Sequence, residues 1–175
     1  MVGPSDRRRS RIGEPIARVN AHPAIRSANP ADIPELARLR WRLYTERGQH
    51  DEPFETYVDR FTAFASDALA RNGWRAWVAE FEGRLVGAMR LQTVQRVPAP
   101  GRGDPQPIGY LTNAYVEPDH RSQGVGSWLL KAVIEHCEAT DHVMVVAWPA
   151  DDAYGFYGRR GFTRPPDPVV YRLGH

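Results

Sequence analysis

A glycine-containing segment between a predicted strand and a predicted helix is the part of this sequence best suited to hold a ligand. Its residues are Arg121, Ser122, Gln123, Gly124, Val125, Gly126 and Ser127. Glycines adopt positive φ angles easily, and their lack of a side chain lets a ligand approach the backbone closely. The first N–H groups of a helix have no intrahelical partner, and with the helix dipole they favour an anion such as a phosphate. Arg121 adds a guanidinium for charge-assisted hydrogen bonds.

The glycine spacing excludes two common nucleotide-binding loops. The segment shows neither the G-x-x-x-x-G-K-[ST] spacing of a P-loop nor the G-x-G-x-x-G spacing of dinucleotide-binding folds. It has Arg-x-x-Gly-x-Gly instead, and that spacing alone is also typical of a structural turn before a helix. The rest of the chain must therefore decide between the two roles.

Cysteine and histidine give no sign of a metal site. Cys137 is the only cysteine, which excludes an internal disulfide and a multi-cysteine zinc site. It falls on the apolar stripe of a predicted helix, so we expect a core residue and not an acyl carrier. His136 and His142 flank the end of that helix without metal-ligand spacing, and we expect His120 to be exposed. The sequence predicts no metal.

The elements that position these residues alternate between strands and helices. Hydrophobic periodicity predicts strands at 24–27, 74–80, 85–94, 108–116, 143–148 and 169–172, and helices at 33–47, 54–69, 124–139 and 151–160. Asp32 is placed to cap the first helix. Residues 143–148 are continuously apolar and predict a buried strand. The pattern is typical of an α/β fold, with an antiparallel hairpin early and a strand–helix–strand crossover later.

Composition indicates one ordinary globular domain with a basic tail. Of 175 residues, 42% are hydrophobic and 25% charged, and no apolar run is long enough to span a membrane. Residues 1–22 carry five arginines against two acids, so we predict a disordered Arg-rich tail and a single domain at 23–175. The net charge is +2, so the remainder is near neutral and argues against nucleic-acid binding in general. The single cysteine and the lack of a recognisable secretory signal predict a cytoplasmic location.

In this context the sequence resembles the GNAT superfamily of N-acetyltransferases. The segment 121–126 matches that family's Q/R-x-x-G-x-G/A pyrophosphate loop, and 115–118 matches the strand end before it. About 35 residues later, Phe156 and Tyr157 followed by Gly161 and Phe162 match the family's tyrosine–turn–Gly-Phe signature. The resemblance covers roughly residues 24–175, and both motifs lie at the family's separation.

The resemblance implies a mixed, mostly antiparallel central sheet, flanked by helices and splayed where acetyl-CoA binds. The backbone of Tyr115 and Val116 would pair with the pantetheine arm of acetyl-CoA. The amides of residues 123–127 would hold the pyrophosphate. The predicted cofactor-binding set is Tyr115, Val116, Arg121, Ser122, Gln123, Gly124, Val125, Gly126 and Ser127.

The same resemblance implies acetyl transfer to an amine by direct attack in a ternary complex. Tyr157 would protonate the departing thiolate, a role that suits a phenol with an ordinary pKa of about 10. A backbone amide near Val116 would stabilise the oxyanion. One departure from the family is Ala150, where many relatives carry asparagine; Asp151 or Asp152 could take over its capping role.

The general base and the acceptor are not visible in the sequence. Strand 108–116 holds no carboxylate. The remaining base candidates are Glu46, Asp51, Glu52, Glu80, or a water held by Thr112 or Asn113. We expect the acceptor pocket to form from the first two helices, the 96–107 loop and the C-terminal segment. Four aromatic residues are expected mostly in the core, with one or two lining this pocket: Trp41, Tyr44, Trp77 and Trp148.

Two other functions remain open. A non-catalytic acyl-CoA sensor on the same fold agrees with the missing base, although Tyr157 argues against it. A nucleic-acid-associated protein would use the arginines of the tail, but the near-neutral charge of the remaining residues argues against this function. For the enzyme we expect a small-molecule or peptide amine as the acceptor and no binding to a membrane. A homodimer is compatible with the sequence.

Overall fold

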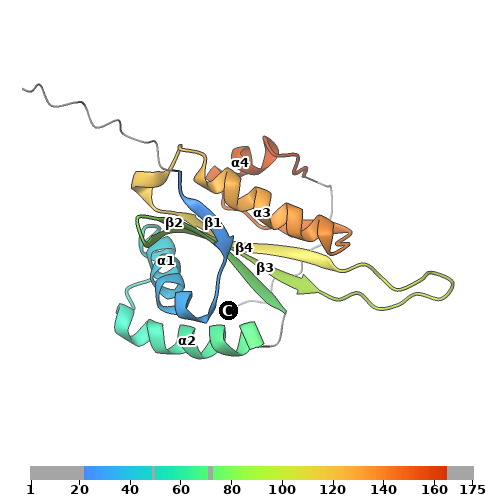
Figure 1. Cartoon of the computed structure of the whole chain (residues 1–175), viewed down its shortest axis with the longest axis horizontal. Coiled ribbons are helices and arrows are strands. Elements are labelled where there is room, and N and C mark those ends of the chain that lie inside the picture. Colours follow the sequence, from blue (N-terminus) through green and yellow to red (C-terminus); the bar gives the residue numbers. More distant parts are fainter. Residues whose placement is uncertain (1–21, 49, 71–72, 165–175) are drawn as a thin grey trace, which may run out of the picture.

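The structure, a computed structural model, describes residues 22–48, 50–70 and 73–164 (Figure 1). Five strands form one sheet in the order β1-β2-β3-β4-β5. They are β1 (Ala24–Ser27), β2 (Trp74–Phe81), β3 (Arg84–Val94), β4 (Ile108–Val116) and β5 (Met144–Ala147). The first four are antiparallel neighbours, and β5 runs parallel to β4. The predicted mixed, mostly antiparallel sheet is confirmed.

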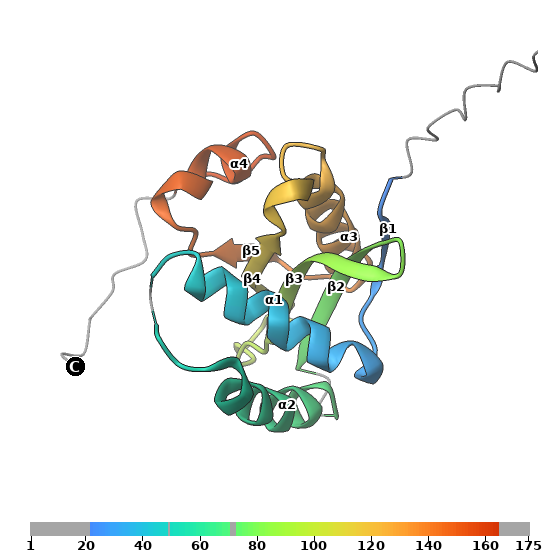
Figure 2. The same ribbon diagram turned by 90° about the vertical axis from the view of Figure 1, so that its left-hand side faces the viewer.

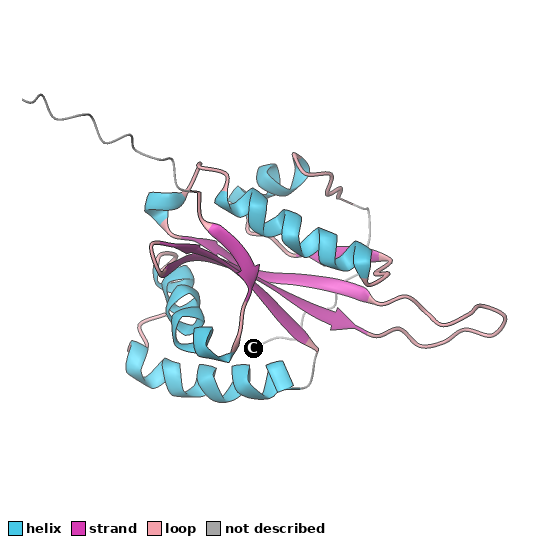
Figure 3. Cartoon of the chain, in the orientation of Figure 1, coloured by secondary structure: helices cyan, strands magenta, loops and turns pink. Residues whose placement is uncertain are grey.

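Helices cover both faces of this sheet. The α-helices are α1 (Ile33–Thr45), α2 (Phe54–Ala70), α3 (Val125–Ala139) and α4 (Tyr154–Gly158). Helices α1 and α2 lie on one face and α3 on the other (Figure 3). On β2, Ala76 and Val78 pack in the core with α1 and α2, whereas Trp77 and Ala79 pack in the core with α3. This is the period-2 alternation of a strand buried on both faces.

The start of α1 differs from the prediction. Asp32 forms no side-chain cap on α1. Its carboxylate accepts hydrogen bonds from the Asn29 N–H at 2.7 Å and from Arg26 of β1 at 2.7 and 2.8 Å. A guanidinium from the neighbouring strand gives this buried carboxylate charge-assisted partners, and Asn29 caps a 3-10 turn (Pro30–Asp32) before the helix. The acid therefore joins β1 to the helix entry.

The C-terminal part holds two further corrections. The apolar run 143–148 is not a buried strand, because Val143, Met144 and Trp148 are 42%, 52% and 64% exposed. Among the described strands β5 stands at one end of the sheet, which leaves its residues partly open. The helix predicted at 151–160 is a 3-10 turn (Asp151–Ala153) followed by the short α4. The strand predicted at 169–172 lies outside the described residues.

The predicted tail also lies almost wholly outside the described residues. Its last residue, His22, is described, and its ring packs edge-on against Trp128 of α3 with 4.9 Å between ring centroids. The chain enters β1 from this contact, and β1 runs beside α3 (Figure 2).

The sheet opens between β4 and β5. Their pairing ends at Leu111 opposite Ala147, but β4 continues for five more residues. Asn113 adopts a positive φ of 52° in the stretch where the register with β3 shifts, as in a β-bulge. The connection between β3 and β4 projects as a long arm away from the body of the molecule (Figure 1). The second half of β4 is therefore free of β5, and the bulge re-aims its side chains.

Candidate active site

A cavity of about 510 Å³ lies where the two strands part. Its walls come from the C-terminal part of α1, the second half of β4, the start of α3, and the segment from β5 through α4. Tyr44 and Trp148 line it and are 37% and 64% exposed. Of the four aromatic residues expected mostly in the core, only Trp77 is buried, so that expectation is wrong. None of residues 96–107 lines it, and neither does α2, so this cavity differs in composition from the predicted acceptor pocket.

The glycine-containing segment forms a tight turn into α3. Gly124 is the N-cap residue with a φ of 89°, and Ser122 has a φ of 60°, so two of its residues are left-handed. The Gln123 amide closes the loop by donating to the Asp119 carbonyl at 2.7 Å. The first amides of α3, including those of Val125 and Gly126, have no intrahelical partner. Gly126 lines the cavity, so this helix start opens onto it.

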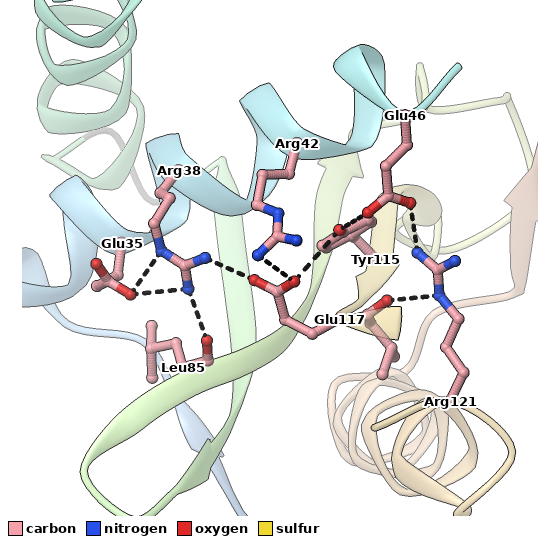
Figure 4. Close-up of polar contacts among 9 residues, drawn as sticks. Glu35, Arg38, Arg42, Glu46, Leu85, Tyr115, Glu117 and Arg121 are labelled. Carbon is pink, nitrogen blue, oxygen red and sulfur yellow. Dashed lines mark hydrogen bonds and ion pairs between the residues drawn. The ribbon is translucent and has the colours of Figure 1, made fainter. Parts of the chain in front are cut away.

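Arg121 is held at the edge of this cavity by two acceptors (Figure 4). Its Nε donates to the Val116 carbonyl at 2.8 Å, and its Nη2 pairs with Glu46 at 2.6 Å. Burial opposes the charge of Glu46, but the hydrogen bonds from Arg121 and Tyr115 outweigh it and lower the pKa of that carboxyl. The guanidinium is therefore fixed beside the loop by a carboxylate that stays ionised at neutral pH.

The side chain of Tyr115 faces α1 and not the cavity. It is buried in the core with α1 and α2, and its hydroxyl donates to Glu46. Burial first, and then the hydrogen bond to Glu46, raise the pKa of Tyr115. The side chain is thus a neutral donor that ties β4 to the end of α1. The backbone of Tyr115 is the part that remains for the predicted role in binding.

Sequence reasoning missed Glu117, which directly follows β4. It is 8% exposed and pairs with Arg38 at 2.6 Å and Arg42 at 2.7 Å, both on α1 (Figure 4). Arginines four residues apart lie on one face of a helix, and that spacing signals a common acidic partner. The sequence does not say which acid it is. This ion-pair network fixes α1 against the strand end that leads into the glycine segment.

Tyr157 lies deep in the cavity wall. It is 7% exposed, and its ring packs edge-on against Phe156 and Phe162, with centroids 5.0 and 5.2 Å apart. Burial raises the pKa of the phenol. Among the described residues none forms a hydrogen bond with its hydroxyl. The site therefore holds a protonated phenol whose hydroxyl is available to a ligand.

The proposed carboxylate bases do not line the cavity. Glu46 is paired as described, Glu80 pairs with Arg26 at 2.8 Å, and Glu52 pairs with Arg60 at 2.7 Å. Asp51 is also absent from its walls. Within the part of the chain that the structure describes, the side chains that line the cavity and could hold or accept a proton include Thr112, Asn113 and Asp152.

Arg160 is a second cation that sequence reasoning did not single out. Its Nη2 donates to the Ser127 hydroxyl in the first turn of α3, and its Nη1 donates to the Phe156 carbonyl at 2.9 Å. The guanidinium also lies 4.1 Å from the centroid of the Phe156 ring. It follows Tyr157 by three residues, so one turn of chain brings both groups to the start of α3. Two arginines thus flank the free amides.

The other candidates for chemistry fall outside the cavity. Cys137 is buried, as expected, and burial raises the pKa of its thiol to about 11, so it is not a thiolate at neutral pH. His120 is half-buried against the Phe81 ring and not exposed as predicted. The described residues contain no group of three or more metal-ligating side chains, and none of the described helices is long and apolar enough to cross a membrane.

The fold is that of solved acetyltransferases. A predicted acetyltransferase of Clostridium acetobutylicum, solved with acetyl-CoA, aligns with a TM-score of 0.72 at 21% identity, over 86% of this chain and 96% of that one. An aminoglycoside N-acetyltransferase solved with CoA also has a TM-score of 0.72, at 19% identity, over 90% and 99%. At these identities the likeness shows the shared fold.

Sequence comparison then gives the family. A probable N-acetyltransferase of Mycobacterium tuberculosis is 24% identical over 144 residues, which cover 79% of this chain and 78% of that protein. The family model described as the acetyltransferase (GNAT) family matches residues 33–162, and the chain belongs to this family. The predicted resemblance is confirmed.

Proposed function

We propose that this chain transfers the acetyl group of acetyl-CoA to an amine by direct attack within a ternary complex. The observation that carries the proposal is the cavity between β4 and β5. It joins the free amides at the start of α3 to the buried phenol of Tyr157. A phosphate-binding helix start and a proton donor in one cavity are the two groups that transfer from a CoA thioester requires.

The cofactor roles follow from backbone groups along this cavity. Beyond Leu111 the β4 backbone has no β5 partner, so Tyr115 and Val116 can pair with the pantetheine arm. The amides of residues 123–126 take the pyrophosphate, with Arg121 beside them and Arg160 across the first turn of α3. The Ser127 N–H, which belongs to the predicted set, donates to the Gly124 carbonyl at 2.9 Å. Ser122, Gly124 and Val125 shape the turn that exposes these amides. The related structures solved with acetyl-CoA and with CoA support this assignment.

The reaction then balances with the groups in the cavity wall. The neutral amine attacks the thioester carbonyl carbon, and a backbone amide near Val116 stabilises the oxyanion. As the C–S bond breaks, the Tyr157 hydroxyl gives its proton to the thiolate sulfur. A water held by Thr112 or Asn113 takes the proton lost by the nitrogen and passes it to solvent, from which Tyr157 regains a proton. Of the carboxylate candidates, Glu46, Glu52 and Glu80 are paired elsewhere and Asp51 does not line the cavity. The products are an acetamide and CoA.

A thiol-release assay with acetyl-CoA across a panel of amines tests the proposal. We expect free CoA to appear only when both acetyl-CoA and an accepted amine are present. Acetyl-CoA alone should raise the melting temperature of the protein, since it binds the folded state. No stabilisation at millimolar acetyl-CoA, with CoA-free protein, would contradict the cofactor assignment.

A non-catalytic acyl-CoA sensor is the second candidate. It is favoured by the scarcity of a general base, because Asp152 is the only carboxylate among the described residues that line the cavity. Stabilisation by acetyl-CoA without release of CoA for any amine in a broad panel would select the sensor. Turnover with one amine would exclude it.

A further inference from the structure

Arg90 is a buried cation without an anionic partner. It lies on β3, is 7% exposed, and stacks over the Phe61 ring of α2 with 4.5 Å from guanidinium carbon to ring centroid. Among the described residues none gives it a hydrogen bond or an ion pair. Burial, and then the positive charge of Arg40, lower the pKa of Arg90 to about 10. Removing a charge from water without a counter-ion is costly, so this position is unusual for a purely structural residue.

Two further donors meet Arg90 from the neighbouring helices. Arg40 of α1 lies over the Tyr44 ring at 4.9 Å, and its Nη1 is fully buried without a partner. The Tyr57 hydroxyl of α2 is also fully buried and unpartnered. Arg40 is close enough to act on the pKa of Tyr57 but lies outside hydrogen-bonding geometry. Donors from three elements therefore converge where no described carboxylate pairs with them, and Arg40 Nη2 donates only to the Tyr44 hydroxyl, at 3.4 Å.

A second cavity, of about 210 Å³, reaches this cluster. Arg40 and Tyr57 line it, together with Glu52 and Arg60, which pair with each other at 2.7 Å. Because Glu52 is paired with Arg60, we do not count its carboxylate as the counter-ion of Arg40 and Arg90. Tyr44 lines both this cavity and the larger one between β4 and β5. The two cavities therefore share this side chain as part of their walls.

We propose that Arg40, Arg90 and Tyr57 form a subsite for the carboxylate of the amine acceptor. A carboxylate accepts several hydrogen bonds at once and suits the planar fork of a guanidinium. Its charge relieves the repulsion between the two arginines, and the buried hydroxyl gains the acceptor it lacks. The substrate class is therefore an amine with a carboxylate at a fixed distance, and polycationic amines are disfavoured. This inference rests on the proposed function.

Matched acceptors test the subsite. The probes are ω-amino acids of increasing length, from glycine to 5-aminopentanoate, each beside its primary amide. For at least one length we expect kcat/KM for the acid to exceed that for the amide by about thirtyfold or more, the scale of charge-assisted bonds in a buried site. Arg90→Met and Tyr57→Phe should each reduce this ratio and leave kcat/KM for the amide within about threefold. Arg102→Met, on the exposed arm, is the matched control and should change neither.

The outcomes separate this inference from the proposed function. Equal kcat/KM for acids and amides, or a preference that survives Arg90→Met and Tyr57→Phe, overturns the subsite and leaves the acetyltransferase intact. If no amine releases CoA, calorimetric titration of the same acids into CoA-saturated protein decides the subsite. Binding of an acid but not its amide, lost in Tyr57→Phe, supports it, and its absence overturns it.

Discussion

Replacing Tyr157 with phenylalanine tests the proposed acid with little disturbance of the fold. The ring is 7% exposed and packs against Phe156 and Phe162, and these contacts survive the change. The hydroxyl forms no hydrogen bond with the described residues, so its loss leaves none of them unpaired. We therefore expect the free energy of unfolding to change by less than about 1 kcal/mol, equivalent to about 2–4 °C in Tm for a chain of this size.

Turnover should respond much more strongly than stability. A positioned general acid contributes about 10²- to 10⁴-fold, so kcat should fall by at least about 10²-fold in Tyr157→Phe. KM for acetyl-CoA should stay within a few-fold, because the hydroxyl acts mainly in the transition state. Burial raises the pKa of Tyr157 above its ordinary value near 10, so it keeps its proton across the neutral range. The wild-type rate should therefore show no alkaline loss from this group below about pH 10.

Steady-state kinetics with a fixed amine, together with calorimetric titration of acetyl-CoA, measure both effects. Full activity in Tyr157→Phe would make the residue a packing group and leave water as the acid. Loss of acetyl-CoA binding together with activity would make it a cofactor contact. A drop in Tm well beyond a few degrees would refute the structural argument, because it would require a hydroxyl partner absent from the described residues.

The other predictions concern the glycine turn and the helix entry. Gly126→Val should abolish acetyl-CoA binding in calorimetry, whereas Gly126→Ala should retain it. A Cβ at this position lies 3.3 Å from the Phe156 ring, and only the larger valine side chain crowds the cavity. Equal affinities of the two variants for acetyl-CoA would count against the phosphate-loop role. Gly124→Ala should lower the free energy of unfolding in urea by about 1–2 kcal/mol, because its φ is 89° and a Cβ would lie 3.1 Å from Trp128. Hydrogen bonds from Arg26 lower the pKa of the Asp32 carboxyl in the folded protein. The contribution of Asp32 to the free energy of unfolding should therefore be fully present above its unfolded pKa near 3.9, and be lost as pH falls through the lower folded pKa. If Asp32→Asn and wild type show the same dependence of unfolding on pH between 2 and 6, this prediction is wrong.

The elements around the site could be predicted because their patterns are local. The apolar spacing of 108–116 and 124–139 gave β4 at its observed bounds and α3 within one residue of its start. The left-handed Gly124 follows from the need for a sharp turn between them, which only glycine adopts without strain. Sequence also placed Cys137 in the core. Each of these inferences depends on neighbours within a few residues.

Errors arose where a residue's partner or its exposure depends on how the elements pack together, even when that partner is near in sequence. Asp32 has the type and position of a helix cap, but Arg26 on β1 binds it instead. The apolar run 143–148 has the composition of a buried strand, yet its exposure depends on its place in the sheet order, which local pattern does not encode. Three further expectations are untested and stay predictions: the disordered Arg-rich tail, the cytoplasmic location and the homodimer. Glu117 was missed because both of its arginine partners come from a helix about 80 residues earlier.

Helix α1 joins the two halves of the proposed site. Its C-terminal end holds Arg121 through Glu46, beside the turn proposed for the pyrophosphate. Tyr44 lines both cavities, and one turn earlier Arg40 belongs to the buried donor cluster. Glu117 clamps the same helix to the end of β4 through two arginines. Since a helix moves largely as one body, its position sets the separation between the thioester and the acceptor carboxylate. That separation, and not the size of either cavity, should decide which length of amino acid places its nitrogen for attack.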